Sequence, residues 1–293
     1  MSKVCFVTGG GSGMGLSAAK FMPKDRIIVV SGRTESKLTK AVEQLREAGF
    51  EAYAKACDTS KRDSVKALAE YAASLGTITN VIHAAGVSPA MKGTMENILR
   101  INALGTVYVN QEFSQKMNQG SVIVDIASMS AYSTPNFMIP KKAYPLAETD
   151  EALFLKKILK LSALTKDEYQ KKGLIYALSK NFVTWYAAKC AFDYGSKGIR
   201  VVSLSPGLIA TDMGNLESEH GGSMLAFSCE GRMGTPEELG FAIATLADER
   251  NGYLAGVDIL CDGGTIRGQK EFRKNKKKRT SISLHKSPQP NRH

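Results

Sequence analysis

The chain has 293 residues, of which 43% are hydrophobic and 23% are charged, so it can bury the core of a globular domain. Its net charge of +11 is uneven, because residues 265–293 hold ten lysines and arginines against one acid and carry +9, which leaves +2 for residues 1–264. A near-neutral body argues against nucleic-acid binding, and the lack of a run of about 18 apolar residues argues against a membrane span.

The cysteines give no sign of a disulfide framework or a metal site. Their number is odd and no pair has the CxxC spacing, and they are Cys5, Cys57, Cys190, Cys229 and Cys261. A strand begins within three residues of Met1, so we expect no signal peptide and a location in the reducing cytoplasm.

Short apolar runs alternate along the chain with longer helical patterns. The expected strands are Val4–Thr8, Ile27–Ser31, Ala52–Ala56, Asn80–Ala84, Ser121–Ile126, Ile199–Leu204 and Val257–Cys261. Helices are expected over Ser36–Ala48, Ser60–Leu75 and Pro236–Ala247. This alternation predicts an α/β protein with a Rossmann-like, doubly wound, mainly parallel seven-stranded sheet, helices on both faces and one domain over residues 1–264.

A glycine-rich segment, TGGGSGMG from Thr8 to Gly15, follows the first strand and opens a helix. Glycines allow a tight turn and let a pyrophosphate approach the backbone, and the helix N-terminus offers free N–H groups. The segment therefore predicts a phosphate-binding turn, although a merely flexible connection is the alternative.

The end of the second strand, Ser31-Gly32-Arg33, bears on the cofactor. An acid there would bind the ribose 2′-hydroxyl of NAD, whereas a nearby arginine accommodates the 2′-phosphate of NADP. Gly32 takes the place of the acid and Arg33 follows, so NADP is favoured over NAD, the alternative being an ordinary surface arginine. Ser12 is not basic, so a second positive contact from the turn is missing.

Further motifs follow in a fixed order. They are CDT at 57–59, HAAG at 83–86, INALG at 101–105, DIAS at 125–128, YALSK at 176–180, SPGLIAT at 205–211 and DGG at 262–264. With the TGxxxGxG spacing of the turn, this series resembles the short-chain dehydrogenase/reductase family over residues 3–264.

The resemblance implies a catalytic set of Asn102, Ser128, Tyr176 and Lys180. Tyr176 and Lys180 share one face of a helix, and the ammonium would lower the phenol's pKa so that it can exchange a proton. Ser128 would hydrogen-bond the substrate carbonyl, and Asn102 would hold a water linking Lys180 to solvent. The implied cofactor-binding residues are Thr8, Gly9, Gly11, Ser12, Gly13, Met14, Gly15, Arg33, Asp58, Thr59, Ala84, Ala85, Gly86, Tyr176, Lys180, Pro206, Gly207, Ile209 and Thr211.

Two departures from the family pattern stand out. His83 and Ala84 replace the usual asparagines, and a structural role for His83 is favoured over a catalytic one. The interval between Ser128 and Tyr176 is 47 residues, where the family leaves about a dozen, so Ser130 is an alternative to Ser128.

The extra length forms an insertion, Ser133–Gly173. We expect an amphipathic helix over Asp150–Leu161, with Leu153, Phe154, Ile158 and Leu161 facing the protein. The favoured interpretation is a lid over the cleft, and the alternative is an element of subunit assembly. The basic tail after Gly264 is expected to be disordered.

The predicted function is NADP(H)-dependent reduction of a ketone or aldehyde, or oxidation of a secondary alcohol. Asp212–Arg232 and the insertion should roof the pocket, and their apolar side chains favour a bulky, apolar and even steroid-like substrate, unless they only pack against the body. The alternatives are a non-catalytic NADP-binding sensor and nucleic-acid binding through the tail, whose only aromatic residue is Phe272. A homo-oligomer, dimer or tetramer, is expected, with no metal, nucleic-acid or membrane partner.

Overall fold

A computed structural model describes residues 2–284, with residues 218–223 and 276–284 described by their backbone alone. In this range seven strands form one sheet of order β3-β2-β1-β4-β5-β6-β7, in which every pairing is parallel. The strands are β1 (Lys3–Thr8), β2 (Arg26–Gly32), β3 (Ala52–Ala56), β4 (Thr77–His83), β5 (Met117–Ile126), β6 (Arg200–Pro206) and β7 (Asp258–Cys261). The predicted Rossmann-like, doubly wound fold is confirmed.

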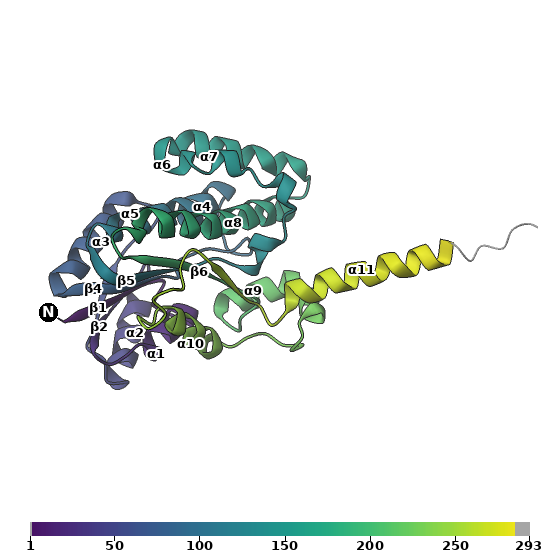
Figure 1. The fold of residues 1–293 in the computed structure, drawn as a ribbon. Coiled ribbons are helices and arrows are strands. Elements are labelled where there is room, and N and C mark those ends of the chain that lie inside the picture. The colour runs from purple at the N-terminus through teal and green to yellow at the C-terminus, as the bar shows by residue number, and fades with distance from the viewer. Residues whose placement is uncertain (1, 285–293) are drawn as a thin grey trace, which may run out of the picture.

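Helices cover both faces of the sheet (Figure 1). One face packs on α1 (Gly13–Phe21), α2 (Glu35–Glu47) and α10 (Pro236–Leu246). The other packs on α3 (Arg62–Leu75), α4 (Met95–Leu99), α5 (Gly105–Ser114) and α8 (Glu168–Gly195). Alternate residues of β1 enter the two cores, since Val4 and Phe6 join one and Cys5 and Val7 the other. Strands covered on both sides must be apolar throughout, which is why these runs were readable in the sequence.

The strand order reverses between β1 and β4, and the connections that follow these two strands leave in opposite directions. In doubly wound sheets a crevice opens at this switch point, beyond the carboxyl ends of the strands. Beyond β6, helix α9 (Asp212–Gly221) and the 3-10 turn η6 (Gly222–Phe227) lie beside the same edge.

Helices α1 and α10 approach each other closely. A side chain at Gly240 would place its Cβ 2.3 Å from the Ser17 hydroxyl oxygen, so only glycine fits the contact. Helix α10 begins with a capping box in which Thr235 and Glu238 bond each other's backbone. The helix that follows the glycine turn is therefore fixed against a second, well-capped helix.

A 3-10 turn, η2 (Met129–Tyr132), leads into the insertion. The insertion then forms two more short 3-10 turns, η3 (Asn136–Met138) and η4 (Lys141–Ala143), followed by α6 (Leu146–Thr149), α7 (Glu151–Leu159) and η5 (Lys160–Leu164). Asp150 caps α7 by accepting a hydrogen bond from the Leu153 backbone. Phe154 and Ile158 are buried as expected, but Leu155 is the third buried residue. Leu161 is partly buried and packs against the core as expected, whereas Leu153 is partly buried without joining that core.

Helices α6 and α7 form an outer layer over the helices of one face (Figure 1). The Phe154 and Tyr144 rings lie 5.3 and 5.2 Å from the Phe182 ring of α8. Glu148 accepts hydrogen bonds from Gln111 and from Tyr186 and pairs with Lys189 at 2.9 Å. The insertion is thus anchored by aromatic packing and a polar network on the outer helices.

The tail differs from its expected disorder, because helix α11 (Thr265–Leu284) occupies most of it. Ile266 is buried, and Phe272 packs edge-on against Phe227 of η6. These two contacts anchor the start of a helix that then projects from the body (Figure 1). Residues 285–293 lie outside the described residues. Among the described helices, none combines the length and apolarity that a bilayer crossing needs.

Candidate active site

The glycine turn closes onto the end of β4. A Cβ at Gly9 would lie 2.8 Å from the Ala84 carbonyl, and one at Gly15 would lie 2.6 Å from the Gly9 oxygen. Gly9 and Gly13 also have φ values of +64° and +57°, which side chains disfavour. The turn therefore needs glycine for close approach of backbone to backbone, and it leaves the N-terminus of α1 open to an anion.

A cavity of about 480 Å³ extends from this turn across the switch point. Its walls include most of the expected cofactor residues, namely Gly9, Ser12, Gly13, Met14, Gly15, Arg33, Asp58, Thr59, Ala84, Ala85, Gly86 and Thr211. Thr8 and Gly11 are not in the wall. Thr8 is fully buried behind it, and Gly11 faces Lys37 and Leu38. An elongated cavity with a bare helix N-terminus at its centre fits a dinucleotide.

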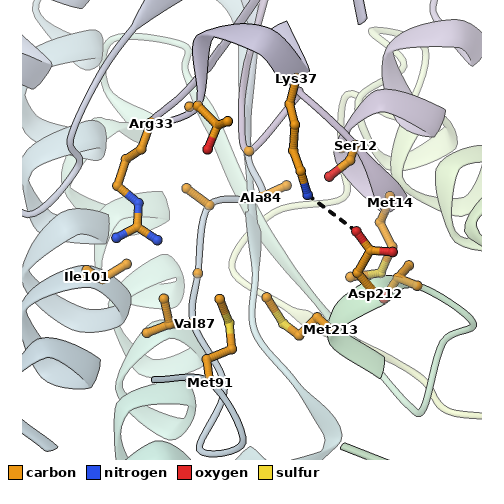
Figure 2. A pocket seen from close by; sticks show the side chains of 18 of the residues that line it. Ser12, Met14, Arg33, Lys37, Ala84, Val87, Met91, Ile101, Asp212 and Met213 are labelled. Carbon is orange, nitrogen blue, oxygen red and sulfur yellow. Dashed lines mark hydrogen bonds and ion pairs between the residues drawn. The ribbon is translucent and has the colours of Figure 1, made fainter. Parts of the chain in front are cut away.

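Two cations, Arg33 and Lys37, line this cavity. Arg33 follows β2, and Lys37 lies four residues later in the first part of α2; the Arg33 side chain points toward Ile101 and the Lys37 side chain toward Asp212 (Figure 2). The Lys37 ammonium pairs with the Asp212 carboxylate of α9 at 3.3 Å, beside Ser12 and Met14 of the turn. Sequence reasoning missed Lys37, although its spacing from Arg33 was a usable signal.

Asp58 lines the same cavity, where β3 runs into the next connection. Its carboxylate accepts hydrogen bonds from the backbone and the hydroxyl of Ser60. Burial raises the pKa of Asp58, but these bonds and the charges of Lys61 and Arg33 lower it by more, so the net shift is downward. An ionised carboxylate that is fixed in this way can accept hydrogen bonds from a nucleotide base or a ribose.

His83 is buried at the end of β4 and does not reach either cavity around the site. Its Nδ1 lies 2.8 Å from the Thr8 hydroxyl, which also accepts from the Ala85 backbone N–H at 3.0 Å. Burial, aided by the charge of Lys180, lowers the pKa of His83 to about 3. A neutral, buried ring that braces the turn supports the structural role over the catalytic one.

A smaller cavity of about 70 Å³ adjoins the first and holds three of the four expected catalytic side chains, Ser128, Tyr176 and Lys180. Its wall also includes Pro206, Gly207, Ile209 and Thr211, which were expected beside the nicotinamide. Residues separated by dozens of positions thus converge because β5, α8 and β6 end at the same edge of the sheet.

Lys180 is 6% exposed and donates a hydrogen bond from Nζ to the Ile126 carbonyl at 2.8 Å. Burial lowers its pKa to about 8, while the carboxyl groups of Glu217 and Asp125 oppose that change. Burial and the charge of Glu217 raise the pKa of Tyr176, and the hydroxyls of Ser128 and Ser130 oppose the rise. The expected lowering of the Tyr176 pKa by Lys180 is therefore absent, because the ammonium is directed at the backbone of β5.

Asn102 lies in a π-helical turn, η1 (Arg100–Leu104), between α4 and α5. Its amide exchanges two hydrogen bonds with the Val87 backbone and donates a third to the Ser179 hydroxyl. A Cβ at Gly86 would lie 3.3 Å from both the Asn102 oxygen and the Lys180 nitrogen. Asn102 thus adjoins Lys180 but is engaged in holding the strand-end loop.

Ser128 and Ser130 both approach the Tyr176 hydroxyl. Ser128 lines the smaller cavity, and its oxygen accepts a hydrogen bond from the Ser130 backbone at 3.2 Å. The Ser130 hydroxyl is buried without a hydrogen-bond partner among the described residues. Of the two serines, only Ser128 lines the smaller cavity.

Glu217 of α9 also lines the smaller cavity, and sequence reasoning missed it. The lining is therefore not purely apolar, because the Glu217 carboxylate stands beside Tyr176 and Lys180. The apolar side chains Val87, Ile126 and Met213 complete this part of the wall.

No residue of the insertion lines either of these cavities. The lid interpretation loses its support for residues 133–168, which pack on the outer helices. Only the end of the insertion approaches the site, where burial and the charge of Glu217 raise the pKa of Tyr169.

Comparison with known proteins identifies the class. Residues 3–140 match the family model for short chain dehydrogenase, and residues 136–265 match that for enoyl-(acyl carrier protein) reductase. The chain belongs to the short-chain dehydrogenase/reductase family and is an oxidoreductase of alcohols or carbonyl compounds.

Its relatives span the same length. The short-chain dehydrogenase/reductase bsc3 of Alternaria brassicicola is 27% identical over 272 residues, covering 91% of this chain and 97% of the relative. The 3beta-hydroxysteroid dehydrogenase 2 of Eggerthella lenta is 28% identical over 275 residues, covering 88% and 92%. A Burkholderia cenocepacia short chain dehydrogenase solved in complex with NADP superposes with a TM-score of 0.72 at 19% identity, covering 90% and 98%.

Proposed function

We propose that this protein uses NADP(H) to reduce a ketone or aldehyde, or to oxidise a secondary alcohol, with Tyr176, Lys180, Ser128 and Asn102 as its functional residues. One observation carries the proposal: Tyr176, Lys180 and Ser128 share a cavity with four residues at and after the end of β6, and that cavity adjoins the glycine-lined one; the four are Pro206, Gly207, Ile209 and Thr211. A sensor that only bound the dinucleotide would have no use for this convergence.

The bound dinucleotide would supply or accept the hydride. Tyr176 would exchange the proton at its Oη with the substrate oxygen, and Ser128 would donate a hydrogen bond to the same oxygen as charge develops on it. Lys180, held by the Ile126 carbonyl, would bind the nicotinamide ribose. Asn102 would keep the Val87 loop in place beside it.

The preference for NADP over NAD rests on the end of β2. Gly32 leaves no acid to meet a ribose hydroxyl, and Arg33 and Lys37 both face the cavity. A guanidinium can bind a phosphate through two parallel hydrogen bonds, and a second cation adds to the attraction.

The substrate proposed is bulky and apolar in its body. Met91, Met213 and Leu216 offer apolar surface along the cavities, and the Eggerthella relative is named for a hydroxysteroid. The test is a panel of ketones, assayed with NADPH, and of secondary alcohols, assayed with NADP⁺. The absorbance of NADPH reports turnover in both directions. Failure of every compound, with tight NADPH binding retained, would favour the sensor instead.

A further inference from the structure

The smaller cavity contains a carboxylate that the proposed chemistry does not use. Glu217 lies on α9, reaches the cavity that holds Ser128, Tyr176 and Lys180, and is partly buried there. A carboxylate removed from water needs compensating partners, because burial disfavours its charged form. Its position beside the reacting groups therefore indicates that it binds part of a ligand.

Two neighbours of Glu217 favour its ionised form. Burial raises its pKa, and the Lys180 ammonium and the Ser88 hydroxyl oppose that rise. Ser88 is 1% exposed, and its hydroxyl makes no hydrogen bond of normal geometry with any described residue. The Ser88 hydroxyl thus faces the Glu217 carboxylate and has no other partner in the described chain. The two form a polar pair next to the substrate cavity.

An ionised carboxylate can only accept hydrogen bonds, with about four acceptor positions on its two oxygens. It therefore recognises either an ammonium or a hydroxyl group. Lys180 already places one positive charge in the same cavity, and a second ammonium there would be repelled by it at low dielectric. A hydroxyl adds a donor without adding charge, so it is the better match.

We propose that Glu217 accepts a hydrogen bond from a second hydroxyl of the substrate, which makes vicinal diols and α-hydroxyketones the preferred substrate class. Glu217 and Tyr176 line the same small cavity, so a group bound to Glu217 lies close to the carbon that faces Tyr176. The apolar body of the substrate lies against Val87, Ile126 and Met213 of the same cavity. This inference rests on the proposed oxidoreductase function and specifies its substrate.

Three compounds built on one ring test it, namely cyclohexanol, 1,2-cyclohexanediol and 2-aminocyclohexanol, oxidised with NADP⁺. The full-length wild type is compared with Glu217→Leu, which removes the acceptor, and with Glu217→Gln, which keeps its shape. Glu237→Gln is the matched control, because Glu237 is an exposed carboxylate on the first turn of α10. Circular dichroism and NADPH affinity verify that each variant is folded.

The wild type and the Glu237→Gln control should use the diol with a kcat/KM about tenfold to a hundredfold above that for cyclohexanol, as expected for a hydrogen bond to a charged group. Glu217→Leu should reduce this ratio to near one. Glu217→Gln should fall between them. The ratio compares two substrates of the same variant, so a change in the pKa of Tyr176 or Lys180, which Glu217 raises, affects both substrates alike.

An equal ratio in the wild type and Glu217→Leu would overturn the proposal, and a still higher kcat/KM for the amine would assign Glu217 to a cation instead. Calorimetric binding of the diol to the enzyme–NADPH complex gives a readout without turnover. Glu217-dependent binding with no turnover of any compound would keep the hydroxyl subsite and reject the oxidoreductase function. Diol binding indifferent to Glu217 would reject the subsite itself.

Discussion

The cleft and the insertion are held together by different kinds of contact. In the cleft, glycine backbones touch other backbones, and single polar side chains such as Thr8 and Asn102 fasten the loops. In the insertion, large rings such as Tyr144 and Phe154 pack on α8. The first arrangement shapes a site with little apolar burial, and the second buries apolar surface and shapes no described cavity. Substitutions in the two regions should therefore separate catalysis from stability.

Removing the phenol hydroxyl in the cleft should have the largest effect. Tyr176→Phe should lower turnover by about 10³-fold or more, because it removes the proton donor and leaves the ring in place. NADPH affinity, measured by fluorescence titration, should change by less than about twofold. Tyr144→Phe is the control from the insertion, since it removes a buried hydroxyl that bonds Asn181, and it should retain turnover. Wild-type turnover in Tyr176→Phe would refute the mechanism.

The reverse outcome is expected in the insertion. Phe154→Ala should lower the free energy of unfolding by about 3–5 kcal/mol, because Phe154 is fully buried among aromatic rings. Chemical denaturation measures this loss, and kcat/KM at low temperature should stay within about twofold of wild type. Phe137→Ala, in the same insertion but 89% exposed, should be nearly neutral. A large kinetic loss in Phe154→Ala would restore the lid interpretation.

Within the cleft, the two cations should control which cofactor is used. Arg33→Ala should raise the KM for NADPH by about tenfold to a hundredfold, through loss of a charge-assisted bond to phosphate, and should hardly alter that for NADH. Lys37→Ala should act in the same direction but less, because its ammonium is shared with Asp212. Lys40→Ala, an exposed position on α2, is the control. Equal effects on both cofactors would remove the phosphate role.

His83 should give the smallest effect, and only in acid. Its pKa of about 3 in the folded protein lies below its ordinary value of about 6.5, so the unfolded chain binds more protons and stability falls as the pH drops below 6.5. At pH 5 this amounts to roughly 2 kcal/mol at most. His83→Asn should therefore lose less in Tm between pH 7 and pH 5 than the wild type. An identical loss would mean that other groups dominate the acid response.

What the sequence reveals depends on how local each signal is. The sheet was readable because strands buried on both faces are continuously apolar, and the turn because its glycines are adjacent. Lys37 and Asp212 meet across 175 residues, and neither pattern nor spacing points to that pairing. Glu217 could not be identified as a site residue for the same reason, since no pattern in the sequence of α9 distinguishes the acid that enters a cavity from its neighbours.

The buried face of α7 and the tail helix α11 were predicted wrongly for a similar reason. Leu155 is buried in place of Leu153 because α7 packs against both α4 and α8, which a single-stripe pattern does not anticipate. The tail helix begins because Ile266 and Phe272 find partners on the body, a contact that composition alone does not reveal.

The close contact of Gly240 with Ser17 has a consequence for how the cofactor site evolves. Helix α1 cannot shift at its phosphate-facing end without α10, and α10 begins at Pro236, which itself lines the larger cavity. The two helices behave as one mechanical unit, with position 240 as the joint. Any residue larger than glycine there would wedge the unit apart and move the turn. A selection for altered cofactor affinity should therefore recover changes at position 240, a site that touches no cofactor.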